Sequence, residues 1–401
     1  MENISKFVFN IYTQDRATLA IKIAYGEPII TYKEDHIALI NKYKEDIDTM
    51  PVRRWDLYKK LVNPYELLHI PHRDKNLGFA DNIPTSRAFY KLWEILHDFS
   101  LIDDTKSITY AALAEGPGGF LDAVEVYRKK YNYKAHDTVH CITLRGTSSA
   151  IPAWKNVNKF KYNISWGDDG TGNLYNINNI RHFSRGVVGG ADLITADGGF
   201  DFTGDYYNQE NSSQKLILAE VVAACATLKV GGHFVLKIFD IFLASTVDIL
   251  YMLSCFFSNV YITKPNTSRS INNEKYIVCK HFKGISARDL ERLYTILELY
   301  DRGETVKRFL QNEIPPEFVN GINNYNFYIV NQQLNYIIKT HIYIHNINRD
   351  LYIACRKKQI IYSLLWCRKY KFPINVHCSY TTSRNFNIEF YKNLNLKSSC
   401  N

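Results

Sequence analysis

Between about residues 107 and 282, short apolar runs of β type alternate with helical runs, and this alternation limits the possible folds more than any other feature. The runs that read as strands are residues 107–114, 138–144, 163–166, 191–196, 233–239, 259–263 and 275–280. The helical runs among them are residues 121–131, 214–228 and 243–257. Strands that alternate with helices build a largely parallel sheet that helices cover on both faces. The sequence therefore predicts an α/β fold with a doubly wound, mostly parallel, seven-stranded Rossmann-like sheet.

The segments on either side of this region read as mostly helical. We predict a helical N-terminal region at residues 1–83, the sheet-containing domain at residues 84–284 and a basic helical region at residues 285–401. At the start of the middle domain, Thr85 and Ser86 can cap a helix whose apolar residues recur every three to four positions. That spacing places Lys91 beside the buried stripe and not within it.

The net charge of +9 is concentrated at one end of the chain. Residues 331–401 contain eleven Lys and Arg residues but only Asp350 and Glu389 as acids, so the rest of the chain is neutral. A basic segment of this kind is typical of proteins that bind polyanions such as RNA. A solvated helical face is the alternative interpretation, and charge alone does not separate the two.

Composition points to an intracellular protein. The apolar run at residues 241–253 contains Asp248 and is shorter than the roughly 20 residues of a membrane-spanning helix. The first ten residues do not resemble a signal peptide. The eight cysteines are scattered without a C-x-x-C pair, which favours neither a disulfide framework nor a zinc site. We therefore expect no membrane association, and a cytoplasmic location or, for a viral protein, the virion or viral factory.

A glycine-rich turn, Glu115-Gly116-Pro117-Gly118-Gly119-Phe120, directly follows the first strand of the sheet and precedes a helix. Ligands of doubly wound sheets bind beyond the carboxyl ends of strands, where glycines let the backbone approach them. Pro117 interrupts the G-x-G-x-x-G spacing of dinucleotide-binding proteins, and there is no phosphate loop. This turn is a candidate ligand site, and a nicotinamide dehydrogenase is disfavoured. A purely structural turn is the alternative.

Polar residues occupy unusual positions at the ends of three later strands. Asp197 follows an apolar strand and precedes two glycines, Lys237 lies inside an apolar strand, and Glu274 stands just before the last one. A buried ammonium is costly unless it is paired or neutral. A lone lysine of this kind is usually structural, but two acids in matching positions favour a functional cluster.

Together these motifs resemble the FtsJ-type family of S-adenosylmethionine-dependent RNA ribose 2′-O-methyltransferases. The resemblance covers residues 84–282 and rests on the glycine turn, Asp197-Gly198-Gly199, the strand with Lys237, and Ser268-Arg269 followed by Glu274-Lys275-Tyr276. The segment Ser86-Arg87-Ala88-Phe89-Tyr90-Lys91 completes the family's K-D-K-E tetrad as Lys91, Asp197, Lys237 and Glu274. Within the family, the branch that methylates mRNA caps in eukaryotes and large DNA viruses is the most similar.

The resemblance implies a methyl donor, S-adenosylmethionine, at the glycine turn, and no metal. Its residues would be Glu115, Gly116, Pro117, Gly118, Gly119, Phe120 and Asp197, with Asp168 or Asp169 on the adenine side. The chain departs from bacterial members, because the turn opens with Ala114-Glu115-Gly116 and the second strand ends at Leu144-Arg145-Gly146 without an acid. The residue that contacts the donor's ribose is therefore open.

The resemblance also implies a reaction. Lys237 would act as the base for a ribose 2′-hydroxyl, with Lys91, Asp197 and Glu274 around it, and the substrate would be the first transcribed nucleotide of capped mRNA. The basic C-terminal segment would bind the RNA. Two alternatives remain, namely the same reaction on ribosomal or transfer RNA, and a non-catalytic RNA-binding or assembly subunit with a methyltransferase fold.

Overall fold

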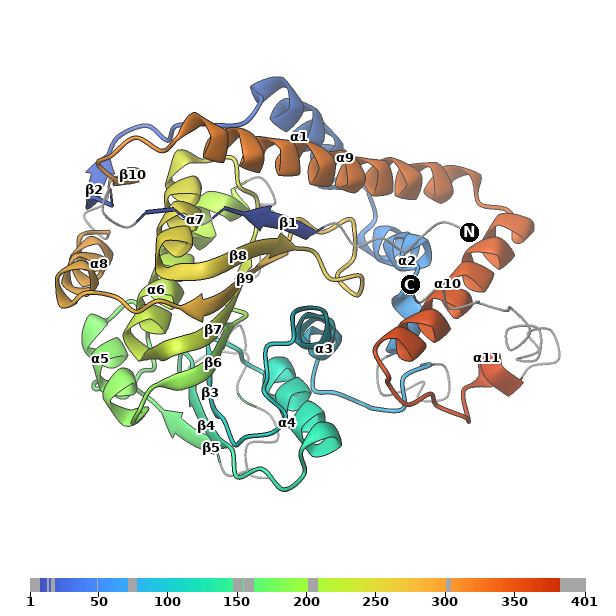
Figure 1. Ribbon diagram of the computed structural model, residues 1–401. Coiled ribbons are helices and arrows are strands. Elements are labelled where there is room, and N and C mark those ends of the chain that lie inside the picture. The colour runs from blue at the N-terminus through green and yellow to red at the C-terminus, as the bar shows by residue number, and fades with distance from the viewer. Residues whose placement is uncertain are drawn as a thin grey trace.

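The computed structural model of the chain describes residues 8–12, 14–15, 19–48, 50–70, 78–146, 154, 162–200, 208–300 and 304–382. Its centre is an eight-stranded sheet with the order β1-β8-β9-β7-β6-β3-β4-β5 (Figure 1). The strands are β1 Val8–Ile11, β3 Thr109–Leu113, β4 Thr138–Ile142, β5 Tyr162–Ser165, β6 Ala191–Ala196, β7 Leu228–Ile238, β8 Phe257–Thr263 and β9 Lys275–Phe282. The strands β3 to β7 pair in parallel, and β9, β8 and β1 follow as antiparallel neighbours. The prediction of a doubly wound, mostly parallel sheet is confirmed.

The sheet has one strand more than the seven predicted. The additional strand is β1, which pairs antiparallel with β8 and places Phe9 opposite Ile262. Four residues are too few for a clear periodic signal, and the edge of β8 supplies the hydrogen bonds that make this segment a strand. The strand β7 also begins five residues earlier than predicted and contains Gly231 and Gly232.

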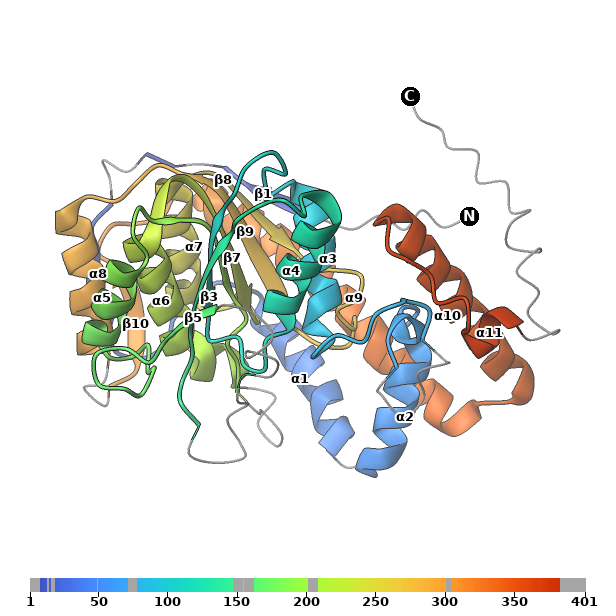
Figure 2. The ribbon, with the colours of Figure 1, turned by 90° about the horizontal axis from the view of Figure 1, so that it is seen from below.

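Helices cover both faces of the sheet (Figure 2). One layer contains α5 Ile177–Gly186, α6 Gln209–Thr227, α7 Ala244–Phe256 and α8 Ala287–Leu299, and the opposite layer contains α3 Ala88–Phe99 and α4 Gly119–Tyr131. On β3, Ala111 and Leu113 face the first layer, and Tyr110 and Ala112 face the second. A strand that is buried on both faces reads as a continuous apolar run, which is why its position was predictable.

The two extensions combine helices with strands. The N-terminal one contains α1 Glu34–Asp48, α2 Val52–Val62 and the short helix η2 Glu66–Leu68, and the C-terminal one contains α9 Pro316–Asn346, α10 Arg349–Lys369 and α11 Ser379–Thr382. Strand β2 Ile21–Tyr25 of the first pairs antiparallel with β10 Val306–Leu310 of the second. The description of both extensions as helical therefore missed β1, β2 and β10. The domain boundaries at residues 83/84 and 284/285 stay a prediction.

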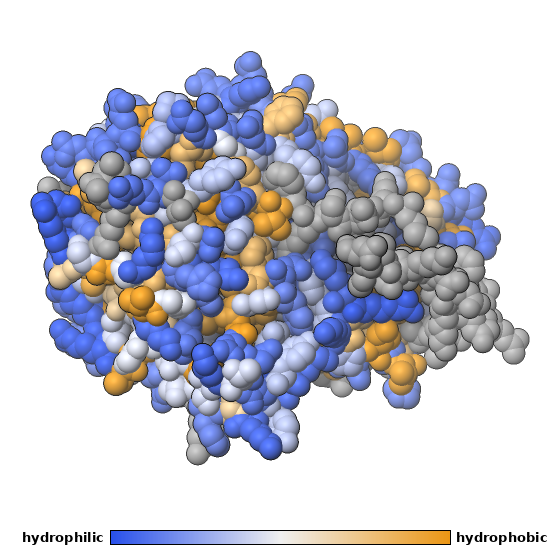
Figure 3. Space-filling view, in the orientation of Figure 1, coloured by the Kyte–Doolittle hydropathy of each residue, from blue (hydrophilic) through white to orange (hydrophobic). Residues whose placement is uncertain are grey.

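The surface in Figure 3 is largely hydrophilic, with apolar side chains scattered over it. Among the helices that the structure describes, none has both the length and the apolar character that crossing a bilayer requires. Helices α9 and α10 carry most of the basic residues of segment 331–401, and Arg384, Lys392 and Lys397 lie outside the described residues.

Candidate active site

The carboxyl ends of β3 to β7 lie at one edge of the sheet, because these five strands are parallel. The start of the antiparallel β9 lies beside the end of β7, with Lys237 opposite Tyr276, and this pairing brings Glu274 to the same edge. Helix α3 supplies Lys91. The structure thus gathers the four predicted tetrad residues into two neighbouring ion pairs.

The first ion pair joins Lys91 and Glu274. The Lys91 Nζ lies 2.7 Å from Oε1 and 2.9 Å from Oε2 of the carboxylate, and the Ser268 hydroxyl donates to Oε1 at 2.7 Å. Burial opposes ionisation of this carboxyl, but the ammonium groups of Lys91 and Lys264 outweigh it and hold the pKa of Glu274 well below its usual range. Glu274 is therefore a carboxylate that fixes the position of Lys91.

The second ion pair joins Lys237 and Asp197. The Lys237 Nζ donates to the main-chain oxygen of Asp197 at 2.7 Å and lies 3.4 Å from its carboxylate Oδ1. The hydroxyl of Tyr276 donates to the same carboxylate oxygen at 3.0 Å. A Cβ on Gly199 would lie 2.9 Å from the Lys237 Nζ, so this glycine lies directly against the amine. The strand-interior lysine is thus paired, as its burial requires.

Two further residues hold the loop that carries Ser268 and Glu274. The Lys264 Nζ donates to the main-chain oxygen of Glu274 at 2.8 Å, and burial lowers the pKa of this lysine to about 7. From α3, the Glu94 carboxylate accepts the N–H groups of residues 266 and 267 at 2.8 and 2.7 Å. The sequence analysis did not predict roles for Lys264, Glu94 and Tyr276, because their hydrogen-bond partners lie elsewhere in the sequence. For Tyr276 alone a signal existed: side chains alternate along a strand, so residues 274 and 276 lie on the same face of β9.

The glycine turn after β3 presents few of its residues to a ligand. Gly116 and Pro117 are partly exposed, whereas the residues after them are buried. Gly118 has a φ of 109°, a left-handed conformation that favours glycine. A Cβ on Gly119 would lie 2.2 Å from the Ser86 Oγ, so this glycine is required for the packing of α4 against the start of α3. Only the first part of the turn is available to contact a ligand.

Glu115 and Phe120 lie beneath the turn. The Glu115 carboxyl is buried and is hydrogen-bonded to the Thr195 hydroxyl, and burial raises its pKa well above the usual range. Phe120 is buried against Tyr276, with 5.9 Å between the ring centroids. Both side chains therefore support the turn from the core.

The two adjacent aspartates after β5 differ in what they contact. The Asp169 carboxylate accepts hydrogen bonds from Thr171 in its own loop and from Asn176 and Asn179 at the start of α5, and these donors lower its pKa. Asp168 is exposed, and its carboxylate has no hydrogen-bond partner among the residues that the structure describes. Asp168 is therefore the aspartate that is free to meet a ligand.

Glu220 is a buried acid that the sequence analysis did not single out. It lies on α6 beneath the Asp197 turn, and its Oε1 accepts the Gly198 N–H at 3.1 Å. A Cβ on Gly198 would lie 2.3 Å from this oxygen. The turn is therefore enclosed by Glu220 on one side and Lys237 on the other.

Comparison with known proteins points to methyltransferases. Residues 84–282 match the model of the FtsJ-like methyltransferase family. Cap-specific mRNA (nucleoside-2'-O-)-methyltransferase 1 of Dictyostelium discoideum is 30% identical over 319 residues, which cover 74% of this chain and 41% of that protein. Cap-specific mRNA (nucleoside-2'-O-)-methyltransferase 2 of Danio rerio is 32% identical over 253 residues, which cover 58% and 33%. The chain thus spans less than half the length of these relatives.

Among solved structures, one described as a ribosomal RNA methyltransferase from Plasmodium falciparum aligns with 50% of this chain and 99% of its own length. The sequence identity is 20% and the TM-score is 0.37.

Proposed function

Residues 84–282 of this chain belong to the FtsJ-like methyltransferase family, and on that premise we propose that it transfers a methyl group from S-adenosylmethionine to a ribose 2′-hydroxyl of RNA. We propose the first transcribed nucleotide of capped mRNA as the acceptor, because the relatives are named cap-specific mRNA methyltransferases. One observation carries the proposal: the Lys237 amine is bound to Asp197 at the end of β7, next to the pair of Lys91 and Glu274.

The tetrad provides for proton removal. S-adenosylmethionine, when bound, supplies a methyl group that its sulfonium already activates, so the protein must align the hydroxyl and accept its proton. After its ammonium has released a proton to solvent, the neutral Lys237 amine would accept the proton of the hydroxyl as the methyl group is transferred to the oxygen. The carboxylate and carbonyl of Asp197 then hold the ammonium that results. Lys91, fixed by Glu274, places positive charge next to the oxygen.

The donor would contact the exposed part of the same edge. Gly116 and Pro117 reach the surface of the turn, and Asp168 has a carboxylate that is free for the adenine side. Asp197 follows β6, which pairs with β3 on the side away from β4 and β5. Of the other residues predicted to bind the donor, Glu115 and Phe120 have buried side chains, and the Asp169 carboxylate is hydrogen-bonded within the protein. The glycines and the free carboxylate together fit a nucleoside ligand with a positively charged sulfur.

The role of Lys237 is tested by replacing it with alanine and, separately, with arginine. We expect Lys237→Ala to lower kcat by about 10²- to 10⁴-fold, the range for loss of a general base, while donor binding is retained. Lys237→Arg keeps the positive charge but cannot release its proton, so it should be equally inactive. Single-turnover methyl transfer and calorimetric donor binding are the measurements.

Substantial activity of the arginine variant would mean that the charge suffices and that Lys237 is not the base. Loss of donor binding in both variants would mean that Lys237 shapes the donor site. Replacement of Lys283, which is exposed just after the far end of β9, is the matched control, and it should leave both measurements unchanged.

The acceptor is tested with capped and uncapped oligonucleotides of identical sequence. We expect transfer to the first transcribed nucleotide of the capped RNA only, mapped by nuclease digestion of the labelled product. Equal transfer to uncapped or structured ribosomal or transfer RNA would contradict the assignment to the cap. Donor binding without transfer to any RNA would favour a non-catalytic subunit.

A further inference from the structure

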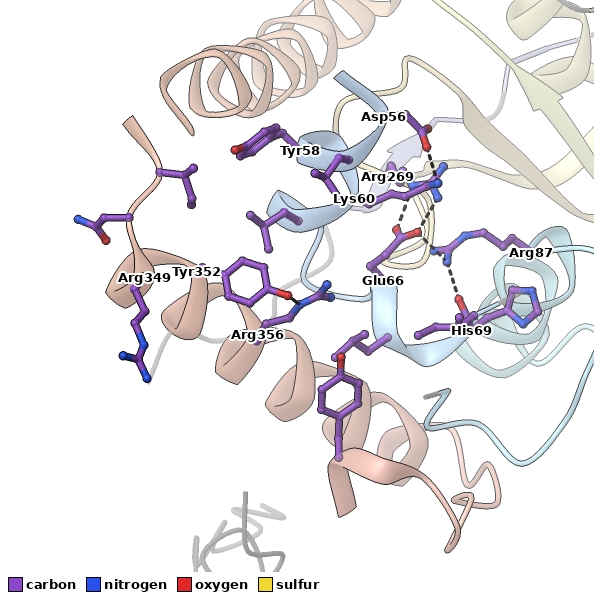
Figure 4. Close-up of a pocket in the computed structure, with 17 residues that line it drawn as sticks. Asp56, Tyr58, Lys60, Glu66, His69, Arg87, Arg269, Arg349, Tyr352 and Arg356 are labelled. Atoms are coloured by element: carbon purple, nitrogen blue, oxygen red, sulfur yellow. Dashed lines mark hydrogen bonds and ion pairs between the residues drawn. The ribbon is translucent and has the colours of Figure 1, made fainter. Parts of the chain in front are cut away.

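A large pocket lies between α2, η2 and α10, outside the matched methyltransferase segment except at its inner wall (Figure 4). Its volume is about 1020 Å³, which is at the upper end of the range for ligand sites. Five basic and two acidic side chains line it, together with the rings of Tyr58, Tyr352 and Tyr380. This combination of excess positive charge and aromatic rings differs from an ordinary solvated helical face.

The inner wall of the pocket is joined to the tetrad. Arg269 binds the Glu66 carboxylate through two hydrogen bonds of 2.7 and 3.0 Å, and Arg87 lies 3.6 Å from the same group. Burial opposes ionisation of Glu66, but the two guanidinium groups outweigh it and lower its pKa. Arg87 is one helical turn before Lys91. Arg269 follows Ser268, which is hydrogen-bonded to Glu274.

The outer wall is formed by α10 and α2. Arg349, Tyr352 and Arg356 are spaced three and four residues apart, so they lie on one face of α10. Figure 4 shows Tyr352 and Arg356 extending into the space across from Lys60 and Glu66. Tyr352 is 43% exposed, and its ring lies 5.2 Å from the Arg356 guanidinium. Arg349 is exposed and forms no ion pair with any residue that the structure describes.

We propose that this pocket binds a single-stranded segment of the RNA substrate next to the nucleotide presented to the tetrad, an inference that rests on the proposed function. Arg349 would contact a phosphate, and Tyr352 would stack on a base, whereas Lys60 is already paired with Asp56. Sequence-tolerant binding of single strands uses this combination, because every base has a flat face and every nucleotide a phosphate. Arg87 and Arg269 line the pocket and are close in sequence to Lys91 and Ser268, so an RNA segment in the pocket would lie next to the tetrad.

The test is direct RNA binding in the absence of a methyl donor. Fluorescence anisotropy with a short uncapped single-stranded RNA would be measured over a series of salt concentrations for the full chain and for Arg349→Ala, Tyr352→Ala and Lys357→Ala. Lys357 is the matched control, because it is exposed on α10 but does not line the pocket. Thermal unfolding would verify that each variant is folded. Because Arg349 is exposed, Arg349→Ala should fold normally and would still test the proposal if Tyr352→Ala were unstable.

We expect Tyr352→Ala to weaken binding by about 10-fold through lost stacking, and Arg349→Ala to reduce the salt slope by about one. Lys357→Ala should change neither. Equal behaviour of pocket and control variants would overturn the proposal. This experiment measures RNA binding and not methyl transfer. A protein that binds RNA through the pocket but transfers no methyl group would therefore contradict the proposed function and support this inference.

Discussion

Glu220 carries a carboxyl group that is fully buried next to the Asp197 turn. Its Oε1 holds the Gly198 N–H, and its Oε2 has no hydrogen-bond partner among the described residues. Burial raises the pKa of Glu220 to about 8, although Lys237 and the Gly198 N–H act in the opposite direction. Near neutral pH the folded protein therefore keeps this carboxyl protonated, whereas in the unfolded chain it ionises at about pH 4.3.

This difference predicts how stability depends on pH. Below the unfolded pKa both states are protonated, and between about pH 4.3 and 8 only the folded state binds the proton, so stability falls as pH rises. A single group contributes a slope of about 1.4 kcal/mol per pH unit. We expect Glu220→Gln, which keeps an oxygen for the Gly198 N–H, to reduce the decline in unfolding free energy between pH 5 and 8 by about this slope.

Urea unfolding at several pH values measures the effect. The exposed Glu298 on α8 provides a matched control, and Glu298→Gln should leave the pH dependence unchanged. Parallel curves for the wild-type protein and Glu220→Gln would mean that Glu220 is already ionised in the folded state.

At the scale of elements, the end of α10 packs on α3, the helix that carries Lys91. Trp366 is 2% exposed and contacts Tyr90 and Tyr370, with centroid distances of 5.6 and 5.0 Å. The Trp93 indole of α3 donates to the Tyr370 carbonyl at 3.1 Å. The C-terminal extension therefore packs against the helix that positions Lys91. Removal of residues 331–401 would expose this core, so point substitutions test RNA binding more cleanly than truncation.

We predict that Trp366→Ala lowers the free energy of unfolding by about 3–5 kcal/mol, the usual cost of emptying a buried tryptophan site. Chemical denaturation measures this change. Tyr133→Ala, at a ring that is 78% exposed, is the control and should have a much smaller effect. A similar small effect of both substitutions would show that α10 is only loosely attached to α3.

At the scale of the whole molecule, the two extensions meet beside α7, where β2 and β10 pair, and again where α2 and α10 line the pocket. β10 pairs with β2, and Asp248 of α7 holds β10 through Arg308 at 2.7 Å and the Phe309 N–H at 2.7 Å. Helix α9 then passes α1 and α2 and leads into α10 (Figures 1 and 2). The first and last parts of the chain thus form one support that holds the basic face of α10 near the start of α3.

The sequence by itself determined the sheet and its active edge. A strand buried on both faces must be apolar throughout, so Asp197 and Lys237 were conspicuous, and parallel strands bring such residues to one edge. Glu274 stood out in the same way just before the last strand, the family resemblance then added Lys91, and the structure places all four together. Their chemical roles stay a prediction.

Only the tertiary structure decided the rest, because the deciding contacts join residues that are far apart in sequence. β1 and β10 are strands because of the edges they pair with. Asp169 differs from Asp168 only through the donors folded around it. Glu220 looks like one more polar residue of a helix until α6 packs beneath the Asp197 turn, and the pocket exists only where α2 and α10 meet. Local sequence patterns indicate which residues are buried, whereas the contacts that each side chain makes depend on the tertiary fold.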